Sequence, residues 1–439
     1  MAGAGGPGTE DGLEALRRGD LAGARRLRLS GLDTFPREIF GLAETLEVLD
    51  LSGGTLDRLP DDLGRLTKLR VLFCSNNRFA RLPSSLGDCQ ALAQVGFRAA
   101  GLREVPGEAL PPHLRWLTLT DNALVSLPDA LGQRPALQKL MLAGNRLTRL
   151  PDTLAGAGRL ELLRIAANAF ETLPPWLVAL PRLAWLAYAG NPVEAAPPRR
   201  PGLAVPWAAL TIGPLLGEGA SGRIHAAYWH GGHRDVAVKF YKGPITSDGL
   251  PEHEMAACLA AGDHPALVGA LGRIENHPEG LDGLVMPRLA PGLQPLAGPP
   301  SLESCTRDVY APDTRPTPVQ VLRIAAGVAA AASHLHARGL LHGDLYAHNI
   351  LWDPAAGAAL LSDFGAASRL APGAAGVALT RLDVRAYGIL LAELHEYCGA
   401  PDSLPPAFGE IARACLSEAV GERPAMAEVS ALLAALEPV

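Results

Sequence analysis

Three oxygen-bearing side chains in the second half of the sequence stand at spacings that could serve chemistry. Asp344 and Asn349 lie five residues apart in HGDLYAHN, and Asp363 follows in SDFG, nineteen residues after Asp344. Carboxylate and amide oxygens are hard ligands of the kind that Mg²⁺ prefers. The pattern favours a magnesium site held by Asn349 and Asp363, beside a carboxylate, Asp344, that can accept a proton from a hydroxyl group.

A glycine-rich segment and a lysine precede these oxygens in the chain. Gly217, Gly219 and Gly222 stand in the spacing G-x-G-x-x-G within LLGEGASGRI. This motif alone is weak evidence, because dinucleotide-binding folds carry it too, but those folds place a helix directly after the glycines. Here strand-like sequence follows instead, with a Gly-Gly hairpin signal and then VAVK, which ends in Lys239. The order favours a loop that covers phosphates, with Lys239 on a neighbouring strand.

Residues 207–439 resemble the eukaryotic-like protein kinase fold, in a bacterial-type form, through GEGASG, VAVK, HGDLYAHN and SDFG in that order. Further along, DVRAYGILLAEL resembles the helix whose aspartate, here Asp383, braces the catalytic loop, and ERPAM supplies the late arginine, Arg423. The resemblance implies an α+β bilobal fold that transfers the γ-phosphate of ATP with the help of Mg²⁺.

The same resemblance implies roles for individual residues. Lys239 would hold the ATP phosphates, and of two glutamates on the following helical segment we predict Glu254 as its partner. Asp344 would serve the acceptor hydroxyl, while Asn349 and Asp363 would hold Mg²⁺. Residues expected around the nucleotide are Gly217, Gly219, Gly222, Lys239, Met286 beside the adenine, and Leu289 in the hinge.

Three departures from the kinase pattern bear on the acceptor. Gly343 replaces the arginine that commonly gathers a phosphorylated activation loop. Tyr346 stands where serine/threonine kinases carry lysine, and His348 stands where many tyrosine kinases carry arginine. The segment 363–383 is short and has no A-P-E, so we expect no ordinary peptide-docking platform and no glutamate partner for Arg423.

The first half of the sequence is a ladder of repeats. Prolines recur every 22 to 24 residues, and an asparagine often precedes the proline by six residues, after an L-x-x-L-x-L frame. Such units bury their leucines only by stacking on their neighbours. The pattern resembles the leucine-rich-repeat family and predicts an α/β solenoid, or horseshoe, in which the leucines and asparagines are structural. The asparagines are Asn77, Asn122, Asn145, Asn168 and Asn191.

The side chains that alternate with the repeat leucines should face a concave surface. Several of them are apolar where water is expected, and an exposed apolar stripe usually marks a binding site. We therefore predict that this face binds a protein partner or substrate, or docks on the chain's own kinase domain. The alternative is that these side chains pack on one another. The residues are Val71, Phe73, Trp116, Met141, Leu162 and Trp185.

Composition places the whole chain in a general class. Its 439 residues suit more than one domain, and a net charge of -6 argues against nucleic-acid binding. No long apolar run predicts a membrane span, and the cysteine spacing predicts reduced thiols, so we expect a cytoplasmic protein. The predicted organisation is an N-terminal tail (1–20), a leucine-rich-repeat domain (21–198), a proline-rich linker (199–206) and a kinase-like domain (207–439).

Three functions remain open from the sequence. The first is an ATP-dependent protein kinase of the serine/threonine type, whose repeats recruit a substrate or regulator. The second is a kinase-like phosphotransferase that acts on a small molecule, which the H-G-D motif and the short segment 363–383 favour. The third is a non-catalytic ATP-binding scaffold.

Overall fold

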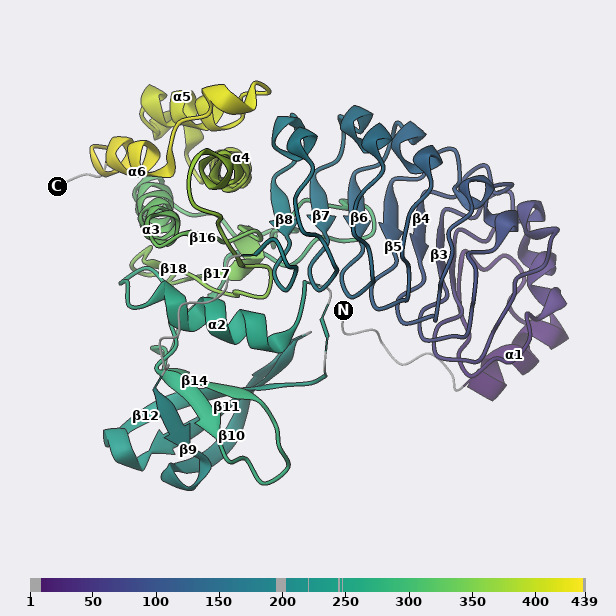
Figure 1. Cartoon of the computed structure of the whole chain (residues 1–439), viewed down its shortest axis with the longest axis horizontal. Coiled ribbons are helices and arrows are strands. Elements are labelled where there is room, and N and C mark those ends of the chain that lie inside the picture. The colour runs from purple at the N-terminus through teal and green to yellow at the C-terminus, as the bar shows by residue number, and fades with distance from the viewer. Residues whose placement is uncertain (1–8, 195–202, 220, 244, 247, 437–439) are drawn as a thin grey trace. The chain divides into compact units, whose positions relative to one another are not determined.

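The computed structural model describes residues 9–194, 203–219, 221–243, 245–246 and 248–436 (Figure 1). The chain forms two compact units. The first comprises residues 1–163 and 168–180, and the second comprises residues 164–167 and 181–439. Each is described in turn.

The repeats supply eight three-residue strands in one sheet, ordered along the chain and parallel wherever pairing is given. Leucines at the middle of the strands, such as Leu49, Leu72 and Leu140, are fully buried. The strands are β1 (Arg26–Arg28), β2 (Val48–Asp50), β3 (Val71–Phe73), β4 (Gln94–Gly96), β5 (Trp116–Thr118), β6 (Lys139–Met141), β7 (Leu162–Arg164) and β8 (Trp185–Ala187).

Short 3-10 helices return the chain after each repeat proline, because proline fixes an extended φ at the start of the turn. These helices are Arg37–Leu42, Leu63–Arg65, Ser84–Leu86, Gly107–Ala109, Asp129–Gln133, Asp152–Gly156 and Pro175–Ala179. The repeat half begins with a helix, α1 (Thr9–Arg18), so part of the predicted N-terminal tail is helical. Residues 1–8 of that tail lie outside the described residues.

The side chains of the repeat asparagines form hydrogen bonds that connect neighbouring turns. The Asn145 side chain donates from Nδ2 to the carbonyls of Leu119 and Leu142, both at 2.9 Å, and its Oδ1 accepts the Leu124 amide at 3.1 Å. Asn77 makes the same contacts: its Nδ2 donates to the carbonyls of Leu51 and Cys74, and its Oδ1 accepts the Leu56 amide. The interior turns thus satisfy backbone groups that burial would otherwise leave without partners.

The predicted apolar stripe is less exposed than the sequence suggested. Phe73 and Trp116 are half-buried and meet edge-on with ring centroids 6.4 Å apart, and the Lys139 ammonium lies 4.1 Å from the Trp116 ring. A Cβ on Gly96 would come within 2.5 Å of the Phe73 ring, so that glycine makes room for it. Packing among neighbours therefore covers part of the stripe around Phe73 and Trp116. Its buried members are Val71, Met141, Leu162 and Trp185.

The second unit contains a six-stranded sheet in the order β10-β11-β12-β14-β13-β9. Its core gathers Val205, Val236, Val238 and Val285, all fully buried. The predicted Gly-Gly hairpin joins β11 to β12. The strands are β9 (Ala204–Pro206), β10 (Leu210–Glu218), β11 (Gly222–Trp229), β12 (Arg234–Tyr241), β13 (Gly272–Glu275) and β14 (Gly283–Pro287). One helix, α2 (Pro251–Ala261), follows β12.

The remainder of this unit is mostly helical, with short strands that hold the catalytic-loop region. The helices are α3 (Pro318–Ala337), α4 (Ala374–Tyr397), α5 (Pro406–Cys415) and α6 (Met426–Ala434). The strands are β15 (Gln294–Pro295), β16 (Leu340–Leu341), β17 (Ile350–Trp352), β18 (Ala359–Leu361) and β19 (Ser368–Arg369). Together with the repeat sheet, this arrangement confirms the predicted fold class.

The compact units divide the chain at a different place from the predicted boundary at residue 198. Residues 181–194, which carry β8, lie in the second unit, as do residues 164–167. Of the predicted linker, residues 199–202 lie outside the described residues, and residues 204–206 form β9, which pairs with β13. Among the described residues, no helix has both the length and the apolar character that a membrane crossing requires.

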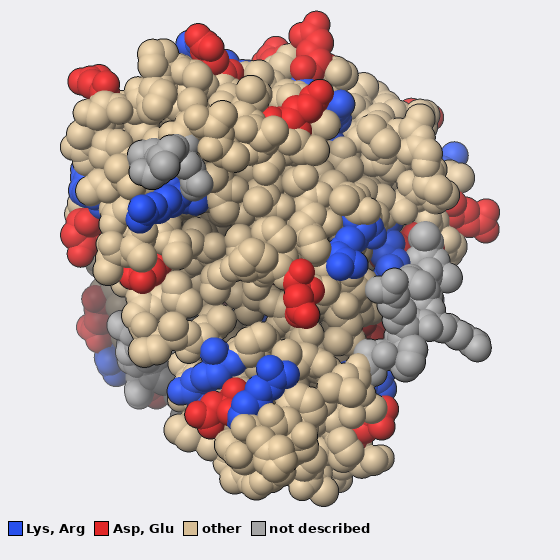
Figure 2. All heavy atoms as spheres, turned by 90° about the vertical axis from the view of Figure 1, so that its left-hand side faces the viewer, with Lys and Arg blue, Asp and Glu red and all other residues tan. Residues whose placement is uncertain are grey.

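Charge is spread over the face drawn in Figure 2. Lys and Arg side chains lie among Asp and Glu side chains there, and neither sign covers a broad continuous area. Such mixed patterning gives no strong local field that would attract one class of charged partner to this face.

Candidate active site

Lys239 and Glu254 form a buried ion pair. Lys239 lies on β12 and Glu254 on the first turns of α2, and the ammonium donates directly to the Glu254 carboxylate. Burial alone would lower the pKa of Lys239, but the carboxylates of Glu254 and Asp363 raise it above its ordinary value. The lysine is therefore held charged, and the structure brings together the pair that the sequence predicted, whereas Glu252 is exposed.

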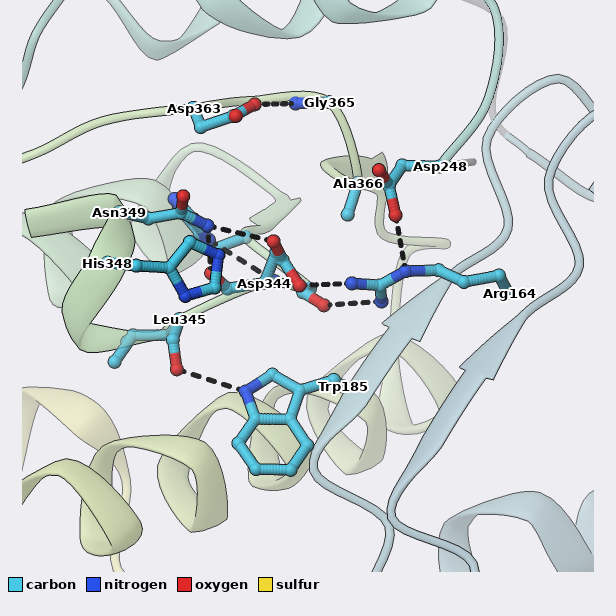
Figure 3. Close-up of polar contacts among 12 residues, drawn as sticks. Arg164, Trp185, Asp248, Asp344, Leu345, His348, Asn349, Asp363, Gly365 and Ala366 are labelled. Carbon is cyan, nitrogen blue, oxygen red and sulfur yellow. Dashed lines mark hydrogen bonds and ion pairs between the residues drawn. The ribbon is translucent and has the colours of Figure 1, made fainter. Parts of the chain in front are cut away.

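Asp344 and Asn349 lie on one loop between β16 and β17, and they face each other. The Asn349 Nδ2 donates to the Asp344 carboxylate at 2.8 Å and to the Asp344 carbonyl at 2.9 Å (Figure 3). The buried Asp383 on α4 fixes the start of this loop, because its carboxylate accepts the amides of His342 and Gly343 at 2.8 and 3.0 Å. Burial would raise the pKa of Asp383, but the His336 hydrogen bond and the nearby histidines lower it.

Asp363 stands opposite Asn349. Its backbone lies in the left-handed region, at a φ of 60°, which is uncommon for a residue other than glycine. One carboxylate oxygen accepts the Gly365 amide at 3.0 Å. In Figure 3 the Asn349 side-chain oxygen points toward Asp363. Two oxygen donors that face one region suit Mg²⁺, which usually takes only one or two protein ligands and completes its shell with phosphates and water.

The predicted nucleotide residues lie on or directly beside β10, β11, β12 and β14 of the six-stranded sheet. A Cβ on Gly217 or Gly219 would meet no protein atom within 4 Å, so packing does not require glycine there and a ligand could approach the backbone closely. Gly222 differs, since a Cβ there would lie 2.4 Å from the Phe240 carbonyl. Met286 is buried on β14, and Leu289 follows that strand, half-buried.

One functional side chain was not predicted. Arg164, the last residue of β7, is 2% exposed and belongs to the second unit. Its Nη2 donates to the Asp344 carboxylate, its Nη1 to the Gly343 carbonyl at 2.9 Å, and its Nε to Asp248 at 2.6 Å (Figure 3). The sequence signal was an arginine among the apolar strand residues, but its partner lies 180 residues away.

The neighbouring strand β8 also contacts the loop that carries Asp344. The Trp185 indole donates to the Leu345 carbonyl at 3.0 Å and stacks on the Tyr346 ring, with centroids 4.1 Å apart and 6° between the planes. Trp185 was predicted as part of an exposed binding stripe; it is 1% exposed, because the catalytic loop covers it. A Cβ on Gly343 would lie 2.3 Å from the Leu186 carbonyl, which explains why glycine stands there.

The late arginine has partners other than a glutamate. Arg423 is buried and donates to the carbonyls of Ser417, Arg381 and Pro181 at 2.8 to 3.0 Å. Pro181 lies on the chain that leads into β8, and α4 begins at residue 374, soon after β19. Residues 181–188 thus contact both the late arginine and the catalytic loop.

Two family models match parts of the chain. The family model described as protein tyrosine and serine/threonine kinase matches residues 210–376, and the leucine rich repeat model matches residues 112–170. A Dictyostelium discoideum protein named "Probable inactive serine/threonine-protein kinase roco10" is 32% identical over 117 residues, which are 24% of this chain and 4% of that protein. The structure of a leucine-rich-repeat protein from Leptospira interrogans is 28% identical, with a TM-score of 0.35, over 40% of this chain and 51% of that one.

The repeat ladder, the two-part second unit and the two family matches lead to the same assignment. Only a small part of the Dictyostelium relative is matched, so its name does not describe the activity of this chain. The chain combines a leucine-rich-repeat region with a protein kinase domain.

Proposed function

We propose that this chain is an active ATP-dependent protein kinase of the serine/threonine type, working in the cytoplasm. The buried Lys239–Glu254 pair carries this proposal. Keeping two charges in a buried site costs free energy that apolar side chains would avoid, so the pair is better explained by chemistry than by stability. Phosphoryl transfer needs such a fixed cation to position phosphates.

The proposed step uses the remaining residues in fixed roles. An acceptor hydroxyl attacks the γ-phosphorus, the bond from that phosphorus to the bridging oxygen breaks, and ADP leaves. Asp344 accepts the hydroxyl proton. Asn349 and Asp363 would hold Mg²⁺, which would supply positive charge against the phosphates, and Gly217, Gly219 and Gly222 would cover the phosphate chain. Met286 and the backbone of Leu289 would contact the adenine.

A second candidate function has one observation in its favour. Residues 181–188 pack beside the catalytic loop, where β8 contacts Leu345 and Tyr346. This packing leaves less room for an extended peptide than for a compact acceptor. A kinase-like phosphotransferase for a small molecule is therefore the alternative, and its distinguishing result is phosphate transfer only when metabolites are added.

The repeats are proposed to recruit the substrate or a regulator. The half-buried Phe73 and Trp116 are the members of the apolar stripe that keep some exposed surface, and aromatic rings are favoured anchors in protein interfaces. We place the kinase domain at residues 207–439 and the repeat domain at residues 21–198. The strand β8, within the repeat range, contacts the catalytic loop of the kinase domain.

The experiment is a phosphate-transfer assay with Mg²⁺ and labelled ATP on the full chain, comparing the native protein with Asp363→Ala. The expected result is label on the native chain alone, mapped to serine or threonine. Asp344→Asn should lose transfer but keep nucleotide binding, because the amide cannot accept the proton. Nucleotide binding with no transfer under any condition would instead indicate a scaffold.

A further inference from the structure

The two carboxylate oxygens of Asp344 are both engaged. Oδ2 accepts the Asn349 amide at 2.8 Å, and Oδ1 accepts the Arg164 guanidinium. A general base must come within about 2.6–3.2 Å of the hydroxyl whose proton it takes. The Arg164 guanidinium takes one of the lone-pair sites on the oxygen that Asn349 does not use, and it competes there with an acceptor hydroxyl.

Arg164 is held in this position from three sides. Its Nε bonds Asp248, which precedes α2, while Nη1 and Nη2 bond Gly343 and Asp344. Charge-assisted hydrogen bonds of this kind are about twice as strong as neutral ones. A guanidinium fixed to two carboxylates and a carbonyl does not move aside without breaking all three contacts.

Burial separates two possible roles of this arginine. A cation that serves the reaction must touch the transferred phosphate or the acceptor, and therefore needs an open surface toward them. The Arg164 side chain is 2% exposed, against 16% for Asp344. A phosphate has no access to a guanidinium so enclosed, so Arg164 acts on the position of Asp344 and not on the phosphate.

A second set of contacts holds the same segment of the chain. The Tyr188 hydroxyl donates to the Arg369 carbonyl at 2.6 Å, and the Tyr188 amide donates to Ser368 at 3.1 Å. The Glu194 carboxylate accepts the Arg369 amide at 2.9 Å. With the Trp185–Tyr346 stack, these contacts fasten residues 185–194 to both the catalytic loop and the strand after SDFG.

We propose that Arg164 and residues 185–194 form an autoinhibitory cap, which holds the kinase site closed until these contacts are released. This inference rests on the proposed function. In the capped state the guanidinium competes with the acceptor hydroxyl for Asp344, and release frees that oxygen for the hydroxyl.

The test is the rate of phosphate transfer by the full chain with labelled ATP and Mg²⁺, for the native protein, Arg164→Met and Asp248→Asn. Methionine keeps much of the length of arginine without its donors. We expect Arg164→Met to raise the rate about tenfold or more, as a cap that keeps most molecules closed requires. Asp248→Asn weakens one of the three anchors by removing its charge, and it touches no proposed catalytic group, so a smaller increase is expected.

Arg146→Met is the matched control, because Arg146 is an exposed arginine in the preceding repeat, and it should leave the rate unchanged. Amide hydrogen exchange in residues 342–349 and 366–369 provides a readout without activity. Exchange should accelerate in Arg164→Met and Asp248→Asn, but not in Arg146→Met. Asp248→Asn keeps the test decisive if Arg164→Met fails to fold.

The outcomes separate the cap from the proposed function. A native chain that transfers phosphate, with folded Arg164→Met and Asp248→Asn equal to it or slower, overturns the cap while the kinase function stands. Absence of transfer by every variant, despite faster exchange in the two release variants, contradicts the proposed function and with it the inhibitory role. Unchanged exchange in both release variants contradicts the cap directly.

Discussion

At the residue scale, the second unit concentrates buried charge around the loop that carries Asp344. Lys239 is paired with Glu254, and Asp383 with two backbone amides and His336. Each of these charges has a partner, as burial demands. A further carboxylate, Glu393 on α4, is half-buried and accepts a hydrogen bond from the Tyr310 hydroxyl at 3.1 Å. It has no part in the proposed chemistry, so its titration reports on folding alone.

Glu393 makes the unit less stable at high pH. Burial raises the pKa of Glu393 to about 8, with Asp308 adding to the effect, so the folded chain holds this proton more tightly than the unfolded chain. The stabilisation is complete below the ordinary pKa near 4.5 and is lost as the pH rises through about 8. Between pH 5 and 8.5 the native chain should lose roughly 4 kcal/mol relative to Glu393→Gln.

Urea unfolding at pH 5, 7 and 8.5 measures this difference. Equal pH dependence of the free energy of unfolding in the native chain and Glu393→Gln would contradict the account.

Sequence reasoning reached the site residues that lie in local motifs and missed the one that does not. Asp344, Asn349 and Asp363 stand in short motifs whose residue types carry their chemistry, and the structure brings them to one region. Arg164 occupies an ordinary repeat position, and nothing local indicates that its partner is 180 residues further on. Contacts set by tertiary packing leave no periodic signal in the sequence.

At the element scale, β8 and the catalytic loop are fitted closely to each other. Gly343 has a φ of 72°, and a Cβ there would lie 2.3 Å from the Leu186 carbonyl and 2.8 Å from the Ala366 carbonyl. Gly343 stands where related kinases commonly carry an arginine, and this close approach gives a direct steric reason for glycine at that position. Residues 9–18 of the predicted tail form a helix. The sequence did not indicate this helix, because so short an amphipathic pattern is weak evidence by itself.

Gly343→Ala should therefore destabilise the second unit by about 3 kcal/mol, since strained φ and overpacking combine. Gly373→Ala is the matched control. Gly373 also has a positive φ, of 85°, but a Cβ there meets nothing within 4 Å, so its cost should be only about 1 kcal/mol. Thermal unfolding of the two variants distinguishes these costs, and equal shifts in midpoint would show that the close approach of β8 to Gly343 is wrong.

The repeat asparagines offer a test in the first unit. Asn145→Ala leaves two carbonyls and one amide without their side-chain partner in a buried turn, and should cost about 2–3 kcal/mol. Thr148→Ala, at an exposed position in the same repeat, should cost less than about 0.5 kcal/mol. The midpoint of urea unfolding gives both values, and a neutral Asn145→Ala would refute the structural role of the asparagine ladder.

At the scale of the whole molecule, the order of the two parts was predictable, and the way the compact units share the chain was not. The repeat period and the fixed order of the kinase motifs extend over long segments of the sequence, so both can be recognised without knowledge of tertiary contacts. The assignment of residues 164–167 and 181–194 to the second unit depends on packing between segments far apart in sequence. In the proposed cap, these residues of the last repeats restrain the kinase site.

The most direct test of this account is γ-phosphate transfer from labelled ATP with Mg²⁺ by the native chain, Arg164→Met and Arg164→Met/Asp363→Ala. The account predicts weak label on the native chain, about tenfold or more on Arg164→Met, and none on the double variant. Nucleotide binding by all three chains, with no label on any of them, would contradict the central claim that this site transfers phosphate.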